Sequence, residues 1–202
     1  MAWDTARTKQ KLLDAAVHEF SEHGPLGARV DRVASRAGVN KERIYQYFGS
    51  KQNLFSAVLE QEMIKLAAAV PLTPELAHDL GEFSGRIYDY HREYPHYLRL
   101  LLWEGLDRNP LDGNPPAARD ERAEHYAGDR RVVALAQADK TLRDDVAPAY
   151  LLYVARSMAA WWLAVPAAID LMLGTTVAGE GPEVRRKALV TLVNDAVRYR
   201  KS

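Results

Sequence analysis

Apolar side chains recur three and four residues apart along most of the chain, which is the spacing that places them on one face of a helix. No stretch shows the sustained alternation and β-branched enrichment typical of a strand. The first helical segment spans about residues 4–22. Its apolar stripe consists of Leu12, Leu13, Ala16, Val17 and Phe20. The pattern predicts an all-α protein.

Glycine and proline separate the predicted helices. Gly24 and Pro25 end the first one, and Ser50 stands where an N-cap belongs, ahead of a longer helix. The other helices are expected at about residues 30–37, 41–48, 74–94, from 95 onward, around 121–131, at 146–173 and at 183–199. Loops are expected at 109–117 and 174–182. The chain should therefore contain about nine helices.

Composition narrows the class of protein. The 202 residues include no cysteine, which excludes disulfides, thiolate metal sites and a cysteine nucleophile. The first residues lack the apolar run of a secretory signal. The longest apolar stretch without charge, residues 157–169, has 13 residues, whereas a bilayer span needs about 20. We expect a cytoplasmic protein with no membrane segment.

Positive charge is concentrated near the amino end. The whole chain has 27 basic and 27 acidic residues, but residues 29–51 contain six basic and two acidic ones, a net charge of +4. A compact basic segment in a neutral protein suggests a localised anionic partner. On composition alone, a solvated helix face is the more ordinary explanation, because basic runs of this size are common on surfaces.

The basic segment has the pattern of a helix-turn-helix. Two short helices are predicted within residues 30–48, and Gly38 can adopt the positive φ that the turn between them requires. The inward positions are Val33, Ala34, Ala37, Val39, Ile44 and Phe48. The second helix should be about 12 Å long, comparable to the width of the DNA major groove. Its outward side chains are Lys41, Glu42, Arg43, Tyr45, Gln46 and Tyr47.

Two motifs carry a family resemblance. They are Val33-Ala34-x-x-Ala37-Gly38-Val39 followed by Ile44-Tyr45-x-x-Phe48-x-x-Lys51-x-x-Leu54, and, before them, Ala15-Ala16-x-x-x-Phe20-x-x-x-Gly24. Together they resemble the amino-terminal DNA-binding domain of the tetracycline-repressor family of bacterial regulators, over about residues 8–55. The resemblance implies a three-helix DNA-binding domain at 1–50 and a larger helical effector-binding and dimerisation domain at 51–202.

The resemblance also implies roles for individual residues. Tyr45 and Lys51 match positions that hold the DNA backbone, Lys51 together with the amino end of the helix that follows. Lys41, Glu42, Arg43 and Gln46 occupy positions of the recognition helix, and Arg29 and Asp31 lie near the start of the preceding helix. Arginine or lysine suits guanine and glutamine suits adenine, at about 1–3 kcal/mol of discrimination for each bidentate contact.

Four of these positions have competing interpretations. Tyr45 and Tyr47 could both be ordinary core aromatics: the motif favours a phosphate contact for Tyr45, whereas Tyr47 fits a contact and a core position equally well. Lys51 taken alone is an ordinary surface lysine. Glu42 is repelled by phosphate, so it must accept from a cytosine amine, pair with a neighbouring cation or point away.

The chain departs from the family pattern at the start of two helices. The family usually has Thr or Ser at the start of the helix before the turn, where the side chain caps the helix and binds a phosphate. Here the residue is Arg29, which can contact a phosphate but cannot cap. Asn40 replaces the more usual Ser before the recognition helix and is itself a good N-cap.

The carboxyl-terminal helices have the character of a dimer interface. The helix around 151–165 is apolar nearly all round, which indicates burial on more than one side. The last helix carries a broad apolar stripe of Val184, Ala188, Leu189, Leu192, Val193, Ala196 and Val197. In the resembled family two such helices from each subunit form the interface, and a dimer reads half-sites about 34 Å apart. The alternative is that both helices only close the monomer core.

Aromatic residues in the middle of the chain suit an effector pocket, since such pockets are largely apolar with a few polar groups. An ordinary core would suit them as well, and the family resemblance favours the pocket. The expected lining residues are Phe83, Tyr88, Trp103, Met158 and Trp162, with Arg156 as a partner for an acidic ligand.

We therefore expect a ligand-responsive, sequence-specific repressor that binds a palindromic double-stranded DNA operator as a homodimer and is released by a small molecule. The alternative is a helical ligand-binding or adaptor protein whose basic segment meets an acidic partner. We expect no catalytic residues, no metal and no cofactor. Two Glu-x-x-His pairs, at Glu75 and Glu93, lie too far apart on one predicted helix to share a metal.

Overall fold

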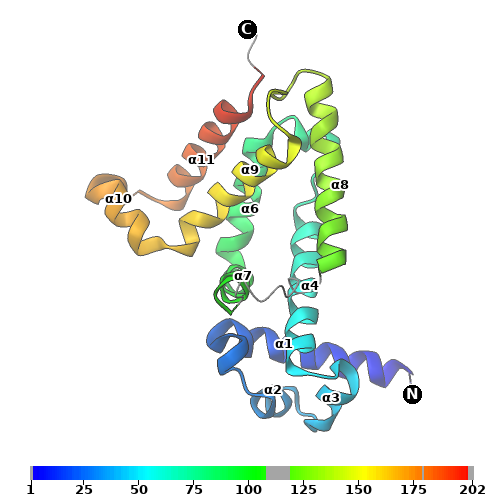
Figure 1. The fold of residues 1–202 in the computed structure, drawn as a ribbon. Coiled ribbons are helices and arrows are strands. Elements are labelled where there is room, and N and C mark those ends of the chain that lie inside the picture. Colours follow the sequence, from blue (N-terminus) through cyan, green and yellow to red (C-terminus); the bar gives the residue numbers. More distant parts are fainter. Residues whose placement is uncertain (1, 108–118, 179, 200–202) are drawn as a thin grey trace. The chain divides into compact units, whose positions relative to one another are not determined.

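The computed structural model describes residues 2–107, 119–178 and 180–199, and every regular element in these ranges is a helix (Figure 1). A single antiparallel bridge joins Leu142 and Arg198. The all-α prediction is confirmed, with eleven helices in the described ranges where about nine were expected. The chain packs as two compact units, residues 1–65 with 95–122 and residues 66–94 with 123–202, which we describe separately.

The first unit contains the helix-turn-helix. Its helices are α1 (Ala2–Gly27), α2 (Val30–Ala37), α3 (Glu42–Phe48), most of α4 (Lys51–Ala69), α7 (Pro95–Asp107) and the start of α8 (Arg119–Ala138). Their shared core includes an edge-to-face contact between Phe20 of α1 and Phe55 of α4, with ring centroids 5.1 Å apart. Of the predicted inward positions, Val33, Ala34, Ile44 and Phe48 are buried, and Ala37 and Val39 pack against the same core.

Local residue chemistry sets the helix boundaries in this unit much as predicted. Gly38 ends α2 with φ 67°, and its N–H bonds to the carbonyl oxygens of Ala34 and Ser35. Gly24 interrupts α1 with φ 66°, after which one further turn continues to Gly27. The Ser50 hydroxyl accepts a hydrogen bond from Asn53 N at 3.0 Å, so Ser50 caps α4.

The second unit is built around α6. It comprises α5 (Pro74–Ala77), α6 (Leu80–Glu93), the rest of α8, α9 (Pro148–Ala164), α10 (Pro166–Ala178) and α11 (Pro182–Val197). Helix α6 packs against α9 and α11 (Figure 1). Gly81 permits the approach of α11, because a Cβ there would lie 2.4 Å from the Val190 carbonyl oxygen. The Ser84 hydroxyl donates to the Ala155 carbonyl of α9 at 2.7 Å.

Two predicted helices are in fact broken. The segment 74–94 divides into α5 and α6, since the carboxylate of Asp79 caps α6 by accepting from Glu82 N at 2.8 Å. The segment 146–173 divides at Val165, and the axes on either side differ by 94°. Pro166 explains this break, because proline has no N–H to donate and its ring clashes with the preceding turn.

Two further expectations change with these breaks. The predicted loop at 174–182 is partly helical, because α10 continues past Gly174, whose φ is 73°, to Ala178. The distance between the two Glu-x-x-His pairs was argued from one continuous helix, so that argument no longer holds. Within the ranges that the structure describes, no three His, Asp or Glu side chains are grouped to hold a metal. The predicted loop at 109–117 lies outside the described residues.

No single helix among the described residues is long and apolar enough to span a membrane. Helix α9 and the part of α10 up to Gly174 meet the length and composition requirement only as a pair, across their 94° bend.

Candidate functional site

The exposed face of α3 holds most of the predicted DNA-contacting side chains. The helix begins at Glu42 with Lys41 as the N-cap residue, so the expectation that Asn40 caps it is wrong by one position, and Lys41 makes no capping bond with its side chain. Ile44 and Phe48 bury the opposite face in the core. The exposed members of the predicted set are Arg29, Asp31, Lys41, Glu42, Arg43, Tyr45 and Gln46.

Several of these side chains restrain one another. Lys41 Nζ lies 3.1 Å from Asp31 Oδ1, and this hydrogen bond together with the carboxylate charge raises the pKa of Lys41. Arg43 Nη1 donates to Gln46 Oε1 at 2.9 Å. Glu42 forms no ion pair with any described residue within 4.0 Å, so pairing with a neighbouring cation is not what holds it here. Lys41 and Arg43 are thus each paired with a neighbouring polar side chain on the exposed surface.

The two tyrosines of α3 differ in their surroundings. Tyr45 is 49% exposed. Tyr47 is half-buried, packs against the core of the first unit and meets Phe48 edge to face at 6.5 Å between ring centroids. A phosphate contact from Tyr45 needs no rearrangement of packing, whereas Tyr47 already contributes to the core.

Lys51 is held by the backbone of the α1–α2 connection. Its Nζ donates to the carbonyl oxygens of Leu26 at 3.3 Å and Ala28 at 3.2 Å. The side chain thus joins the first residue of α4 to the segment that precedes α2. This bracing role is additional to the predicted phosphate contact, which remains a prediction.

A buried acid that the sequence did not single out organises the start of α2. Arg29 is the N-cap residue, with extended backbone and no side-chain capping bond, as expected for arginine. Instead, Glu19 of α1 accepts from Arg29 N at 2.8 Å and from Arg32 Nε at 2.8 Å. Burial raises the pKa of Glu19, but the hydrogen bonds from Arg32 and Arg29 outweigh it and the pKa is lowered. The sequence does contain a signal for this role. Glu19 lies three residues after Ala16 and next to Phe20, so it is an acid on the apolar stripe of α1.

The predicted effector residues fall in both units. Trp103 belongs to the first, where its indole N–H donates to Ser21 O at 3.2 Å. Phe83 and Tyr88 are fully buried in the second. There Arg156 lies over the rings of Phe83 and Tyr126, at 5.2 and 5.3 Å from their centroids, and donates to Asp129 Oδ2 at 2.5 Å. Arg156 is therefore paired with a protein carboxylate.

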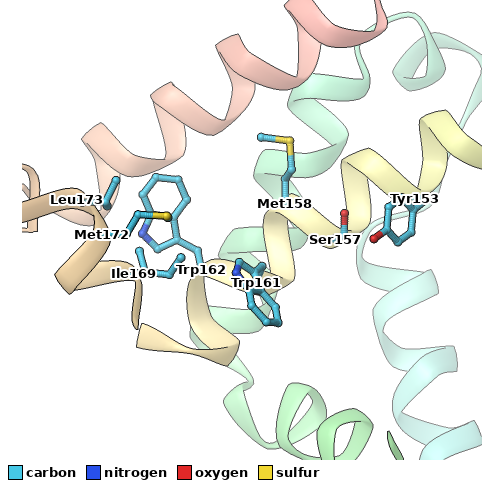
Figure 2. A pocket seen from close by; sticks show the side chains of 8 residues that line it. All are labelled: Tyr153, Ser157, Met158, Trp161, Trp162, Ile169, Met172 and Leu173. Carbon is cyan, nitrogen blue, oxygen red and sulfur yellow. The ribbon is translucent and has the colours of Figure 1, made fainter. Parts of the chain in front are cut away.

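A cavity of about 450 Å³ lies where α9 bends into α10 (Figure 2). Its walls are Tyr153, Ser157, Met158, Trp161, Trp162, Ile169, Met172 and Leu173. Met158 and Trp162 belong to the predicted effector set, and the other predicted residues do not line this cavity. Figure 2 shows the Trp162 indole toward Met172 and Leu173, with Tyr153 and Ser157 farther along α9. A volume of this size and an apolar wall with two hydroxyls suit a small organic ligand.

Helix α9 also carries apolar side chains that the described part of the chain leaves exposed. Tyr150, Tyr153 and Trp161 are 65%, 68% and 58% exposed, and their spacing puts them on one side of the helix. On α11, Leu189 and Val193 are buried. Two other members of the predicted stripe, Val184 and Leu192, are 47% and 54% exposed. These helices therefore close the core of their unit and still leave apolar side chains in solvent.

Comparison with known proteins agrees with this arrangement. The model described as bacterial regulatory proteins, tetR family, matches residues 12–58. The model described as tetracyclin repressor-like, C-terminal domain, matches residues 79–197. The two matches cover the helix-turn-helix and most of the remaining helices.

Curated relatives share much of the chain. The HTH-type transcriptional repressor SCO4008 of Streptomyces coelicolor is 39% identical over 178 residues, which are 88% of this chain and 90% of that protein. The HTH-type transcriptional repressor NicS of Pseudomonas putida is 32% identical over 144 residues, 69% of this chain and 68% of that protein.

Solved structures show the same fold. The crystal structure of SCO4942 from Streptomyces coelicolor matches with a TM-score of 0.78 at 32% identity, covering 96% of this chain and 99% of that one. A TetR family transcription regulator from Marinobacter aquaeolei VT8 matches with a TM-score of 0.73 at 18% identity, covering 99% of this chain and 100% of that one, and supports the fold alone. The chain belongs to the tetR family of bacterial regulatory proteins.

Proposed function

We propose that the protein is a cytoplasmic transcriptional repressor that binds a palindromic operator as a homodimer and leaves it when a small molecule binds. The observation that carries the proposal is that α3 is amphipathic, with one face buried in the core and a polar face exposed. Ile44 and Phe48 fix one side in the core, while Lys41, Arg43 and Gln46 present hydrogen-bonding groups on the other. The relatives SCO4008 and NicS are named transcriptional repressors, which supports repression rather than activation.

In this proposal the DNA-binding residues divide into two classes. Arg43, Lys41 and Gln46 read base edges, since their donors and acceptors match guanine and adenine in the major groove. Arg29, Tyr45 and Lys51 contact the backbone and set the register without carrying sequence information, while Tyr47 holds α3 against the core of the first unit. Asp31 acts through its pair with Lys41, at 3.1 Å, and Glu42 contacts DNA only if a cytosine amine lies within reach.

Dimerisation is supported by the uncovered apolar faces of α9 and α11. A single helix-turn-helix makes few base contacts, and a twofold dimer doubles them on a palindromic site. The exposed aromatic side chains of α9 are of the kind enriched at the centre of protein interfaces.

The effector site is supported by the cavity of about 450 Å³ at the bend between α9 and α10. A ligand alters DNA binding only if it prefers one conformation of the dimer. To convert dimers that almost all bind DNA into dimers that almost all do not, the ligand must bind the second conformation more tightly than the first by about 5.5 kcal/mol. Movement of α4, which begins directly after the helix-turn-helix, would change the separation of the two α3 helices.

Selection of bound sequences from random duplexes tests the DNA-binding part. We expect a palindromic consensus, and we expect candidate ligands to reduce its recovery. Recovery of no common sequence would contradict the proposal and favour the alternative, an adaptor whose basic segment binds an acidic protein.

Arg43→Ala then tests the role of α3. Removing one base-reading guanidinium should weaken binding to the selected duplex by about 1–3 kcal/mol and relax the preference at one position of each half-site. Arg131→Ala is the matched control, because Arg131 is exposed on α8 and pairs with exposed Glu124 at 3.1 Å. Quantitative binding at fixed salt distinguishes them. Equal losses in both variants would mean that Arg43 contributes only charge.

A further inference from the structure

We infer that Glu19 is the positioning residue that sets the start of α2, and with it the placement of Arg29 against DNA. This inference rests on the proposed DNA-binding function. It starts from the residue at the N-cap of α2, which is an arginine with no side-chain acceptor to offer. The first N–H groups of a helix lack partners within the helix, so another group must supply the acceptor.

Glu19 supplies it from another helix. Its Oε1 accepts from Arg29 N at 2.8 Å and from Arg32 Nε at 2.8 Å, and its Oε2 lies 3.0 Å from the same Nε. Arg32 Nη2 lies 2.5 Å from Oε1 and also donates to Gly27 O at 3.2 Å. The side chain of Glu19 is 5% exposed. One buried carboxylate thus binds the N-cap residue and the third residue of α2 to α1.

The arrangement resembles a capping box in which the acid comes from another helix, α1, and not from the third position of α2. In the usual form, a Glu at the third helical position accepts from the N-cap backbone N–H. Here the third position is Arg32, whose positive charge is unfavourable at the positive end of the helix dipole. Glu19 accepts the N-cap N–H in place of that residue and neutralises Arg32 at the same time. The lowered pKa of Glu19 keeps the carboxylate charged at neutral pH.

The consequence for DNA binding is that Arg32 and Arg29 have different roles. The guanidinium of Arg32 is bound to the buried carboxylate of Glu19. The side chain of Arg29 is exposed, and the hydrogen bond from its backbone N–H to Glu19 fixes the position from which that side chain extends. Because Arg32 neutralises Glu19, the carboxylate adds little repulsion toward the phosphates. Without it, α2 would lose its attachment at the N-cap and Arg32 would lose its counter-ion.

The test compares Glu19→Ala with Glu22→Ala on the selected duplex. Glu22 is the matched control, because it lies on the same helix, is 56% exposed, has its one ion pair within 4.0 Å among the described residues with His23, at 3.8 Å, and acts on Arg32 only through its charge. We expect Glu19→Ala to weaken binding at least tenfold, measured where circular dichroism shows a folded protein, and Glu22→Ala to bind as the wild type or slightly better. Equal affinities for the two folded variants overturn the inference.

A double-mutant cycle separates positioning from general stabilisation. If Glu19 acts through the placement of Arg29, Glu19→Ala should weaken DNA binding at least threefold less in an Arg29→Ala background than in the wild type. Equal losses in the two backgrounds overturn the positioning role. If Glu19→Ala is unfolded, Glu19→Gln, whose amide oxygen still accepts from Arg29 N, is compared with Glu19→Leu, which has no acceptor. Glu19→Gln should bind the duplex more tightly than Glu19→Leu, and equal affinities would likewise overturn the inference. If the wild type binds no duplex selectively, the proposed function itself is contradicted.

Discussion

At the scale of the residue, buried His91 is the group whose charge state folding changes most clearly. It lies on α6 and is 4% exposed, and burial together with the positive charge of Arg156 lowers its pKa to about 4. The unfolded chain should protonate His91 near its ordinary pKa of about 6.5. Between these values the unfolded state binds more protons, so folding becomes less favourable as the pH falls.

We therefore expect His91 to remove about 3 kcal/mol of the free energy of unfolding as the pH falls from about 7 to 4, and little more below that. His91→Asn should flatten this part of the pH dependence. The direct measurement is an NMR titration of the His91 imidazole. A midpoint close to that of an unperturbed histidine would show that the ring is not buried in solution.

Residues of the site differ in how far the sequence alone could identify them. Arg43, Tyr45 and Gln46 follow from helical spacing, because Ile44 and Phe48 lie four residues apart on the core face and these three positions lie off that face. Tyr47 does not follow from spacing alone, since it is half-buried against the same core. Glu19 does not follow from spacing. Its bonds to Arg29 and Arg32 form only once α1 and α2 pack, and a stripe of apolar residues gives no partner for an acid within it.

At the scale of the element, short-range chemistry sets all of these boundaries, but it was predictable only where the hydrophobic pattern is also interrupted. Gly38 and Ser50 end and begin helices through bonds within four residues. The segment 74–94 has a helical pattern throughout, yet Asp79 caps α6 and breaks it. In the same way, Pro166 turns a long apolar segment into α9 and α10. A strong hydrophobic pattern outweighed these single residues in the prediction.

The cap of α4 gives the prediction that belongs to this scale. Ser50→Ala removes the acceptor of Asn53 N, so the free energy of unfolding should fall by about 1 kcal/mol. Ser56→Ala is the control, since Ser56 lies inside the same helix and its hydroxyl donates to Gln52 O at 3.2 Å. Alanine favours a helix interior, so that change should be close to neutral. Urea unfolding measures both, and equal values would show that Ser50 is not a cap.

At the scale of the whole molecule, the uncovered apolar side chains of α9 and α11 are the feature that one chain does not explain. The core accounts for Leu189 and Val193, but Tyr150, Trp161 and Leu192 remain more than half exposed. Apolar side chains that gather on neighbouring helices without a cover usually mark an interface. A second copy is the partner that the proposed palindromic operator requires, because its symmetry mirrors that of a twofold dimer.

Leu192→Glu should therefore dissociate the dimer, because a charge at the buried centre of an interface loses its hydration without gaining a partner. Leu135→Glu is the matched control, since Leu135 is 64% exposed on α8. Sedimentation equilibrium should show a dimer for the wild type and Leu135→Glu and a monomer for Leu192→Glu. The monomer should lose most affinity for the full operator while keeping its weak affinity for a half-site, because its α3 is unaltered. A dimeric Leu192→Glu protein would place the interface elsewhere, and an equal loss at the half-site would mean that the substitution damages the fold itself.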